Sequence, residues 1–212
     1  MEADLLEYEK ALYKKGYSFI AGTDEAGRGP LVGPVVAAAV ILPKNYKLEG
    51  LTDSKKLTEK KRDKYYDIIL KDAVSVGVGI VSPEIIDKIN ILEASRLAMN
   101  EALDNLSVKP DYILTDAMKL NRDVEVLPII HGDALSLSIA AASVIAKVTR
   151  DRMMIEFGKK HPEYEIEKHK GYPTERHIEL LKKYGVIEEY RKTFKPVKDI
   201  LEGSNNCEEN SD

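Results

Sequence analysis

The sequence predicts an α/β domain, because short apolar segments typical of strands alternate along the chain with longer amphipathic segments typical of helices. Residues 18–24 and 35–42 are apolar and flank a glycine-rich turn, which indicates two neighbouring strands. Residues 73–81 alternate small and β-branched side chains and predict a third. Two further apolar segments, 111–115 and 124–130, end shortly before an aspartate and complete the set of strands.

Capping residues and apolar stripes predict the helices between these strands. Residues 4–14 have the pattern of a short amphipathic helix. Thr58 begins a second helix, and Ser82, followed by proline, begins a third, since hydroxyl side chains are common N-caps. The longest helix is expected from residue 134 to about 157, and another covers 175–184. The core face of the longest helix is formed by Leu137, Ala141, Val144 and Val148.

Composition indicates an ordinary globular protein. The 212 residues suffice for one substantial domain with a small appendage, and 43% are hydrophobic while 32% are charged. No apolar segment reaches the length of a membrane span, and the N-terminus is acidic, unlike the basic start of a signal peptide. We therefore expect a cytoplasmic protein with no membrane partner. A monomer is expected as well, since no apolar face of the predicted elements requires a partner.

The distribution of charge permits a nucleic-acid partner although the formal net charge is −4. Residues 1–9 and 202–212 each hold four acids and no base. The chain between them carries 32 basic against 28 acidic residues and is mildly basic. Residues 202–212 have the polar, acidic composition of a disordered tail. The single Cys207 excludes an internal disulfide.

A basic helical C-terminal subdomain is predicted at 159–201, after a main domain at 1–158. Its first part places Tyr164 and Tyr172 among histidines and lysines. Rings beside cations suit the sugars, bases and phosphates of nucleic acid, but they equally suit a solvated surface whose tyrosines cap the core. The same two interpretations apply to Lys55, which lies in a loop before the second helix.

The turn after the first strand suits a phosphate ligand, but its pattern is not a dinucleotide fingerprint. Gly27, Gly29 and Gly33 follow a GxGxxxG spacing, and a strand rather than a helix comes next. The glycines allow backbone N–H groups to approach a ligand closely, and Arg28 offers a donor fork for phosphate. A hairpin turn with a surface arginine would have the same sequence.

Acids at strand ends predict a metal site. Asp24 and Glu25 end the first strand, Asp116 ends the fourth, and Asp133 precedes the longest helix, where it would also serve as an N-cap. Carboxylates within about 5 Å repel one another by roughly 3 kcal/mol per pair at an effective dielectric constant near 20, so they require cations. An all-oxygen ligand set favours Mg²⁺ or Mn²⁺, and two such ions suit in-line displacement at a phosphodiester. His131 is interpreted as structural, because no second histidine stands at metal-ligand spacing.

A series of motifs identifies a resemblance to a known family. In chain order they are GTDEAGRGPLVGPVVAAAVIL, LTDSKKL, INILEASRLAM, TDAM, HGDALSLSIAAASVIAKVTRDRMM and HKGYPT. In this order and at these intervals they closely resemble bacterial ribonuclease HII, from about Gly16 to Val197. The resemblance implies a ribonuclease H-like fold, with a five-stranded mixed sheet flanked by helices and a small helical C-terminal part. It implies hydrolysis of the RNA strand of RNA/DNA hybrids. It also implies incision 5′ to a single ribonucleotide in duplex DNA, leaving 3′-hydroxyl and 5′-phosphate ends.

The resemblance also implies roles for individual residues. The metal-binding and catalytic acids of the family, which hold two divalent ions, match Asp24, Glu25, Asp116 and Asp133. The element that reads the 2′-hydroxyl of the ribonucleotide matches Gly27, Arg28 and Gly29. Tyr172 matches the tyrosine that packs on the deoxyribose beside the junction, and Lys55 matches a phosphate-contacting lysine. Thr23 and Pro173 are minor departures from the family pattern that leave these positions intact.

Other classes of protein fit the sequence less well. A ribonuclease HIII is expected to carry an extra N-terminal domain, and a type 1 ribonuclease H would lack the GRG and HKGY elements. A phosphoesterase of small molecules would share the acids but have no use for Tyr172 or the basic C-terminal part. A nucleic-acid-binding module without activity would not need four converging carboxylates. The sequence therefore favours a metal-dependent ribonuclease that acts on RNA/DNA hybrids and on ribonucleotide-containing duplex DNA.

Overall fold

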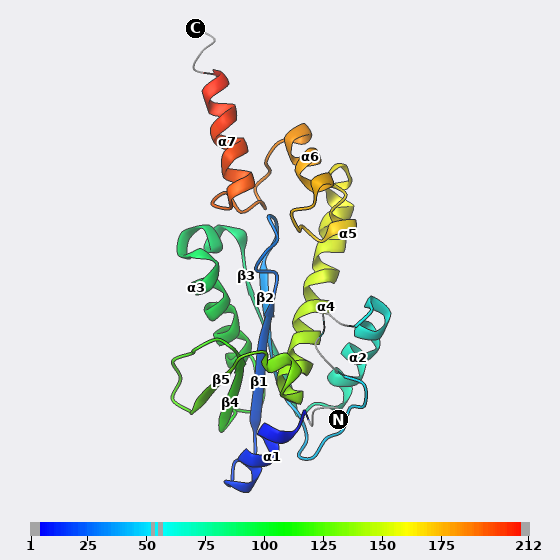
Figure 1. The fold of residues 1–212 in the computed structure, drawn as a ribbon, viewed down its shortest axis with the longest axis vertical. Helices are drawn as coiled ribbons and strands as arrows, with labels where there is room; N and C mark the ends of the chain where they lie inside the picture. Colours follow the sequence, from blue (N-terminus) through cyan, green and yellow to red (C-terminus); the bar gives the residue numbers. More distant parts are fainter. Residues whose placement is uncertain (1–4, 52–53, 55–56, 209–212) are drawn as a thin grey trace.

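A five-stranded sheet forms the centre of the molecule in the computed structural model, which describes residues 5–51, 54 and 57–208 (Figure 1). The strand order is β3-β2-β1-β4-β5. The strands are β1 (Ile20–Ala26), β2 (Val35–Ile41), β3 (Ser75–Val81), β4 (Tyr112–Asp116) and β5 (Val126–Ile129). β1 and β2 are buried along most of their length, as expected for central strands covered on both faces.

The sheet is mixed. β1 pairs antiparallel with β2, and β2 pairs antiparallel with β3, whereas β4 lies parallel to both β1 and β5. In the β1–β4 register Thr23 stands opposite Thr115, so the next residue of each strand is an aspartate. β5 is a four-residue edge strand that contains Pro128. Proline is tolerated at a sheet edge because an edge strand leaves outward N–H positions unpaired.

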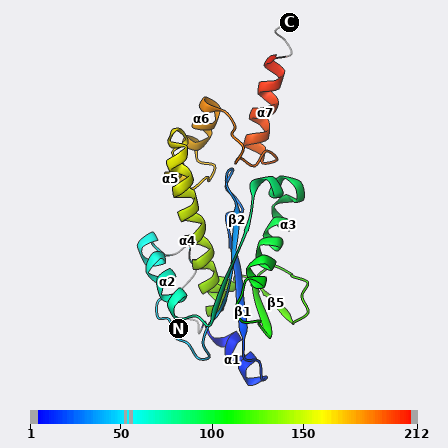
Figure 2. The ribbon, with the colours of Figure 1, turned by 180° about the vertical axis from the view of Figure 1, so that it is seen from behind.

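Helices cover both faces of the sheet (Figure 1, and Figure 2 from behind). α3 packs on one face, and α4, supported by α2, packs on the other. The helices are α1 (Glu7–Lys14), α2 (Glu59–Asp72), α3 (Pro83–Asp104), α4 (Leu137–Lys160), α5 (Ile166–His169), α6 (Glu175–Tyr184) and α7 (Lys195–Glu208). Short 3₁₀ turns lie at η2 (Gly132–Ala134) and η3 (Pro162–Tyr164). The predicted caps at Thr58 and Ser82 are confirmed, because their side chains accept hydrogen bonds from Lys61 N and Ile85 N.

Glycines bring both helical layers against the sheet. A Cβ on Gly22 of β1 would lie 2.2 Å from the carbonyl carbon of Ser138 in α4. A Cβ on Gly77 or Gly79 of β3 would lie 2.1 Å from a backbone oxygen of α3. No side chain fits between these backbones, so the absence of a Cβ fixes how close each helix stands to the sheet.

The C-terminal part packs against the loop between β1 and β2. Leu31 and Val32 of this loop share one buried cluster with Met154 of α4 and with Tyr164 and Tyr190. α5, α6 and α7 lie together beyond one end of the sheet, at the end opposite α1 (Figure 1). The segment 159–201 thus shares its core with the main domain.

Two sequence expectations differ from the structure. The longest helix begins at Leu137 with Ser136 as its N-cap, not at 134, and Asp133 lies in the separate turn η2. The hydroxyl of Ser136 accepts from Ile139 N and so takes the capping role considered for Asp133. The segment 202–212 was expected to be disordered, but α7 continues through Glu208. Ion pairs one turn apart, Lys195–Asp199 and Lys198–Glu202, support its propagation.

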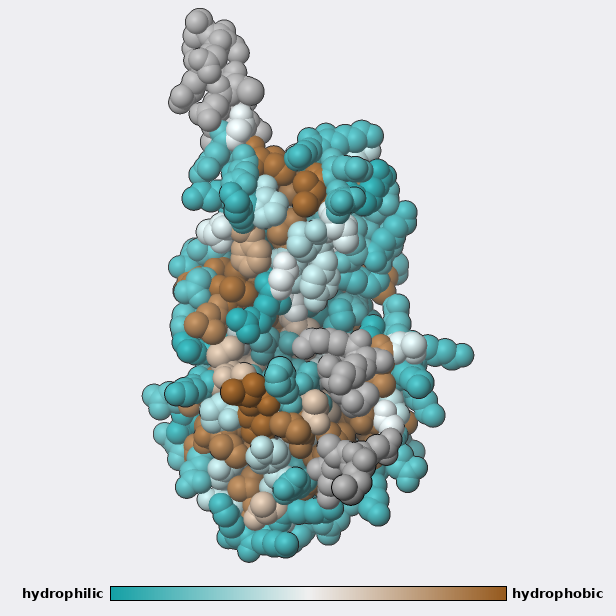
Figure 3. All heavy atoms as spheres, in the orientation of Figure 1, coloured by the Kyte–Doolittle hydropathy of each residue, from teal (hydrophilic) through white to brown (hydrophobic). Residues whose placement is uncertain are grey.

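The surface separates into polar and apolar areas. Figure 3 shows polar residues over α5 and α6, and an apolar area over β5 and the turn that follows it. Ile130, at the end of β5, is 73% exposed. Within the residues that the structure describes, no helix combines the length and apolar character needed to cross a bilayer.

We expect Gly22→Ala to destabilise the fold by about 3 kcal/mol or more, because the added methyl group would overlap the backbone of α4. Gly203→Ala is the matched control, since a Cβ on Gly203 meets no atom within 4 Å and alanine favours a helix. Urea denaturation followed by circular dichroism measures both variants. Equal stability of Gly22→Ala and wild type would show that α4 does not pack as closely on β1 as described.

Candidate active site

Three carboxylates from three different elements meet at one point of the sheet. Asp24 of β1, Asp116 of β4 and Asp133 of η2 each offer an oxygen atom within 4.8 Å of the others. Asp24 and Asp133 are buried and Asp116 is partly buried. The convergence expected from the strand ends therefore exists for these three acids.

The parallel pairing of β1 with β4 places two of these acids side by side, and a hydrogen bond ties the turn that contains the third to Asp116. Thr23 and Thr115 are paired, so Asp24 and Asp116 follow on neighbouring strands. Asp116 Oδ1 accepts from the backbone N–H of Gly132, at 2.8 Å, which ties the η2 turn to the end of β4. His131 just before this turn is in the left-handed region, with φ of 57°.

Burial and neighbouring negative charge make the ionised form of Asp24 unfavourable. Burial raises the pKa of Asp24 well above its usual range, and the charges of Glu25 and Asp116 raise it further. Hydrogen bonds from the Ser143 hydroxyl and from Glu25 N, the latter at 2.7 Å, lower it in part. A cation at this point would relieve the repulsion.

Glu25, which follows Asp24, is not one of the three clustered acids but lies next to them. Its Oε1 pairs with Arg28 at 3.3 Å, while its Oε2 is buried with no hydrogen-bond partner among the described residues. Burial raises the pKa of Glu25, the charge of Arg28 opposes this, and Asp116 raises it again. A buried carboxylate oxygen without a partner is costly unless a ligand meets it.

The donor set fits a hard divalent cation. Every candidate ligand is a carboxylate oxygen of Asp24, Asp116 or Asp133, and Glu25, whose Oε2 is buried without a hydrogen-bond partner among the described residues, interacts electrostatically with Asp24 and Asp116. Oxygen ligands of this kind suit Mg²⁺ and Mn²⁺, whereas no cysteine or histidine joins the cluster within the described part of the chain.

A buried arginine from the C-terminal part holds the loop that follows β1. Arg191 is fully buried, and its guanidinium donates to the carbonyl oxygens of Gly27 at 2.6 Å, Arg28 at 3.0 Å and Gly33 at 2.9 Å. Burial lowers the pKa of Arg191 to about 9, with the neighbouring Arg150 contributing. Hydrogen bonds from Arg191 to backbone carbonyl groups therefore hold the Gly27–Arg28–Gly29 turn in place.

A second buried arginine joins the same loop to the HKGY segment. Arg150 of α4 donates to Pro34 O at 3.0 Å and Val32 O at 3.2 Å, and also to Lys170 O at 3.0 Å. Leu31 N donates to Gly171 O at 2.8 Å, which adds a direct contact between the two segments. Five N–H groups in a rigid fork make arginine suited to such a clamp.

Tyr172 lies beside the glycine-arginine-glycine turn. Its ring is 39% exposed, and a Cβ on Gly29 would lie 3.7 Å from it. Lys147 Nζ of α4 stands 5.5 Å from the centre of the ring. The backbone carbonyl of Tyr172 accepts from Nδ1 of His177, whose pKa burial lowers to about 4, and Nε2 of this neutral imidazole accepts from the Tyr190 hydroxyl. The structure thus places an exposed ring next to the clamped turn.

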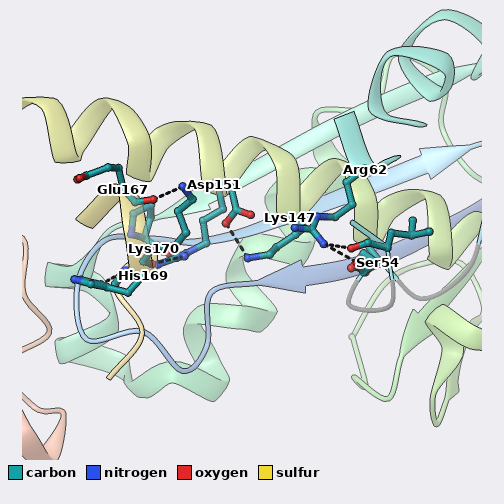
Figure 4. A network of polar contacts seen from close by, with 12 residues as sticks. Ser54, Arg62, Lys147, Asp151, Glu167, His169 and Lys170 are labelled. Atoms are coloured by element: carbon teal, nitrogen blue, oxygen red, sulfur yellow. Dashed lines mark hydrogen bonds and ion pairs between the residues drawn. The ribbon is translucent and has the colours of Figure 1, made fainter. Parts of the chain in front are cut away.

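A contact between two serine side chains joins the loop before α2 to α4 beside the site. Ser54 Oγ lies 2.8 Å from Ser143 Oγ, and Arg62 donates to the backbone oxygens of Ser54 and Leu57. Figure 4 shows the contact between Arg62 and Ser54, and the ion pair of Lys147 with Asp151 at 2.8 Å. Lys55, the expected phosphate contact in this loop, lies outside the described residues.

Several residues of this site were missed by the sequence analysis. Arg150 had a signal, because it interrupts an otherwise small or apolar i, i+4 stripe made of Ala146, Met154 and Gly158. Ser143 lies within an apolar helix face and could have been identified in the same way. Arg191 stands in a basic stretch that resembles a solvated surface, and nothing local indicates its burial.

Solved structures with the same fold define the class of this protein. The crystal structure of ribonuclease H2 from Pyrococcus horikoshii matches with a TM-score of 0.75 and 30% identity, covering 88% of this chain and 98% of that one. The structure of Bst-RNase HIII in complex with Mn²⁺ matches with a TM-score of 0.65 over 92% of this chain and 73% of that one; at 18% identity it supports the fold alone. The fold is that of the ribonuclease H enzymes.

Sequence comparison gives the family. The Ribonuclease HII family model matches residues 21–197. Ribonuclease HII from Bacillus cytotoxicus is 57% identical over 198 residues, covering 93% of this chain and 76% of that protein. The chain belongs to the ribonuclease HII family, which confirms the resemblance seen in the motifs and the mixed five-stranded fold that it implied.

Membership in this family establishes the general activity. The chain is a hydrolase of the ribonuclease H type, with ribonuclease activity on RNA/DNA hybrids, and nucleic acid is its substrate. Enzymes of this type depend on metal ions, in agreement with the carboxylate cluster.

We expect Asp24→Asn to stabilise the protein in the presence of a chelator by on the order of 1–3 kcal/mol at pH 8, because it removes a buried charge from a group of like charges. Since the pKa of Asp24 is raised in the folded state, wild type gains stability as pH falls through that raised value toward the ordinary one. The difference between variant and wild type should therefore shrink at pH 5.

Urea denaturation at the two pH values measures this difference. Asp67→Asn, at an exposed position on α2, is the matched control and should change little at either pH. A variant less stable than wild type at pH 8 would mean that the Asp24 carboxylate stabilises the fold without metal.

Proposed function

We propose that this enzyme, besides cleaving RNA/DNA hybrids, incises duplex DNA 5′ to a single ribonucleotide and leaves 3′-hydroxyl and 5′-phosphate ends. The observation that carries this proposal is that the Tyr172 ring lies beside Gly29 of the glycine-arginine-glycine turn, which begins two residues after Glu25. A nuclease that recognised long hybrids by general shape would need the acids alone. A fixed turn beside an exposed ring suits recognition of one junction.

The direction of the backbone N–H groups supports the proposal that this turn recognises the 2′-hydroxyl. Arg191 occupies the carbonyl oxygens of Gly27 and Arg28. No peptide bond among the described residues is cis, and the C=O and N–H groups of a trans peptide point in opposite directions. The N–H groups of Arg28 and Gly29 therefore point away from the clamp and are suited to donate to a hydroxyl oxygen, the group that distinguishes RNA from DNA.

Asp24, Glu25, Asp116 and Asp133 would hold two divalent ions, with Mg²⁺ or Mn²⁺ as the candidates. When bound, the two ions supply an activated water and stabilise the leaving oxygen of the phosphodiester. The carboxylates fix the ions, Arg28 offers a positive charge to the phosphate, and Lys147 offers another beside Tyr172. Tyr172 would pack on the deoxyribose beside the junction.

The setting of the enzyme follows from this reaction. We propose a monomer that acts in the cytoplasm, where ribonucleotides incorporated into DNA would be removed. Lys55 would contact phosphate from the loop that Ser54 and Arg62 hold near α4. The proposed division into a catalytic domain at 1–158 and a basic subdomain at 159–201 assigns cleavage to the first and contact with the junction to both.

We expect Asp116→Asn to abolish incision of a labelled DNA duplex that contains one ribonucleotide, while folding and duplex binding persist. Asparagine retains the oxygen that accepts from Gly132 N but removes the charge that a metal requires. Gel analysis with Mg²⁺ or Mn²⁺ should give a single cut 5′ to the ribonucleotide for wild type only. Cleavage of a continuous hybrid by wild type without incision of this duplex would limit the function to hybrids.

We expect Tyr172→Ala to lower kcat/KM for the single-ribonucleotide duplex by about 10-fold or more, since stacking on a ring contributes roughly 1–3 kcal/mol. Tyr172→Phe, which keeps the ring, should retain most activity. Tyr184→Ala is the control, because Tyr184 is similarly exposed but is separate from the clamped turn. If thermal stability and activity fell together in Tyr172→Ala, the ring would be structural.

A further inference from the structure

Two backbone donors in the first turn of α4 are satisfied by the N-terminal segment, and a third by the N-cap serine. The first N–H groups of an α-helix have no partner within the helix. In α4, Leu137 N donates to Leu5 O at 2.7 Å, Ser138 N donates to Glu9 Oε1 at 3.0 Å, and Ile139 N donates to Ser136 Oγ at 3.3 Å. Residues before β1 thus cap the helix that follows the acidic turn.

Glu9 is an unusual side chain for a surface helix. It lies on α1, is only 1% exposed, and its Oε1 also accepts from the hydroxyl of Ser136 at 2.7 Å. Its Oε2 is buried with no hydrogen-bond partner among the described residues. A buried carboxylate that is only half satisfied is unfavourable for folding, so its presence points to a role beyond stability. Its negative charge also lies at the positive end of the α4 dipole.

A continuous set of hydrogen bonds leads from Glu9 to the carboxylate cluster. Glu9 fixes Ser136, and Ser136 N donates to Gly132 O at 2.8 Å. Gly132 begins the η2 turn that contains Asp133, and Gly132 N donates to Asp116 Oδ1. The position of Asp133 relative to Asp116 therefore depends on a turn whose far end is held by α1.

We propose that Glu9 is a positioning residue for the metal site: it fixes Ser136 and the η2 turn, and so sets the distance between Asp133 and the other acids. The inference rests on the proposed metal-binding role of these acids. Glu9 lies outside the region matched by the family model, which begins at residue 21. α1 lies next to the beginning of α4, at the end of the sheet opposite α7 (Figure 1).

The test compares three variants with wild type. Glu9→Ala removes both accepted hydrogen bonds, whereas Glu9→Gln keeps one oxygen that can accept from Ser136 and Ser138. Leu12→Ala is the matched control, because Leu12 anchors α1 in an apolar cluster with Ile20 and Ile139, and its side chain can take no part in the hydrogen bonds that Glu9 accepts. Mn²⁺ binding to the free protein is measured by calorimetry, and kcat and KM are measured on the single-ribonucleotide duplex.

We expect Glu9→Ala to weaken Mn²⁺ binding and to lower kcat by about 10-fold each, as is typical when groups that orient metal ligands are removed, with KM for the duplex unchanged. Glu9→Gln should stay close to wild type. Leu12→Ala should lower the unfolding temperature without changing Mn²⁺ affinity. A purely structural Glu9 would lower only the unfolding temperature.

Two results would overturn the proposal: Glu9→Ala with wild-type Mn²⁺ affinity and kcat, or the same loss of affinity in Leu12→Ala. If Glu9→Ala does not fold, Glu9→Asp, which keeps the charge but shortens its reach, serves in its place with the same expectation. A wild-type protein that neither binds Mn²⁺ nor cleaves would instead refute the proposed function, so the two failures are distinguishable.

Discussion

The close packing of α4 on β1 is the constraint on which the rest of the structure depends. Gly22 leaves no side chain between the two backbones, so the helix can lie directly over the strand that carries Asp24. The η2 turn before α4 then brings Asp133 to the same point, and Ser143 within α4 reaches Asp24. A bulkier residue at position 22 would separate two layers that each supply part of one site. The helix thus acts as a common support for the acids and for the loops around them.

The buried arginines of this region are satisfied by groups other than the carboxylates of the site. Among the residues that the structure describes, Arg150 and Arg191 have no ion-pair partner, and these buried side chains donate to carbonyl oxygens instead. Carbonyl partners let the clamp form without consuming the nearby carboxylates, which remain available for metal. The acceptors that hold the clamp are therefore backbone carbonyl oxygens, and the carboxylates of the same small region are separate from them.

Much of this organisation could be predicted from sequence, and the failures have physical causes. Asp24 and Asp116 were predicted because an acid at the end of an apolar strand is conspicuous. Asp133 was predicted as a site residue, but the helix start was placed too early, since a 3₁₀ turn and an α-helical turn have similar local patterns. Arg191 could not be predicted, because its burial depends on contacts with residues about 160 positions earlier. Disorder was assigned to 202–212 from composition, yet α7 continues through Glu208.

The pairing of α1 with the start of α4 also bears on synthesis. Glu9 and Ser136 are 127 residues apart, and the central strand β1 needs both β2 and the much later β4 as neighbours. At about 5–20 residues per second, the ribosome takes roughly 8–30 s to proceed from α1 to the end of α4. During that time the nascent chain contains Asp24 and Glu25 but no assembled cluster. The three carboxylates can therefore come together only after the longest helix has been released from the ribosome and has docked on the sheet.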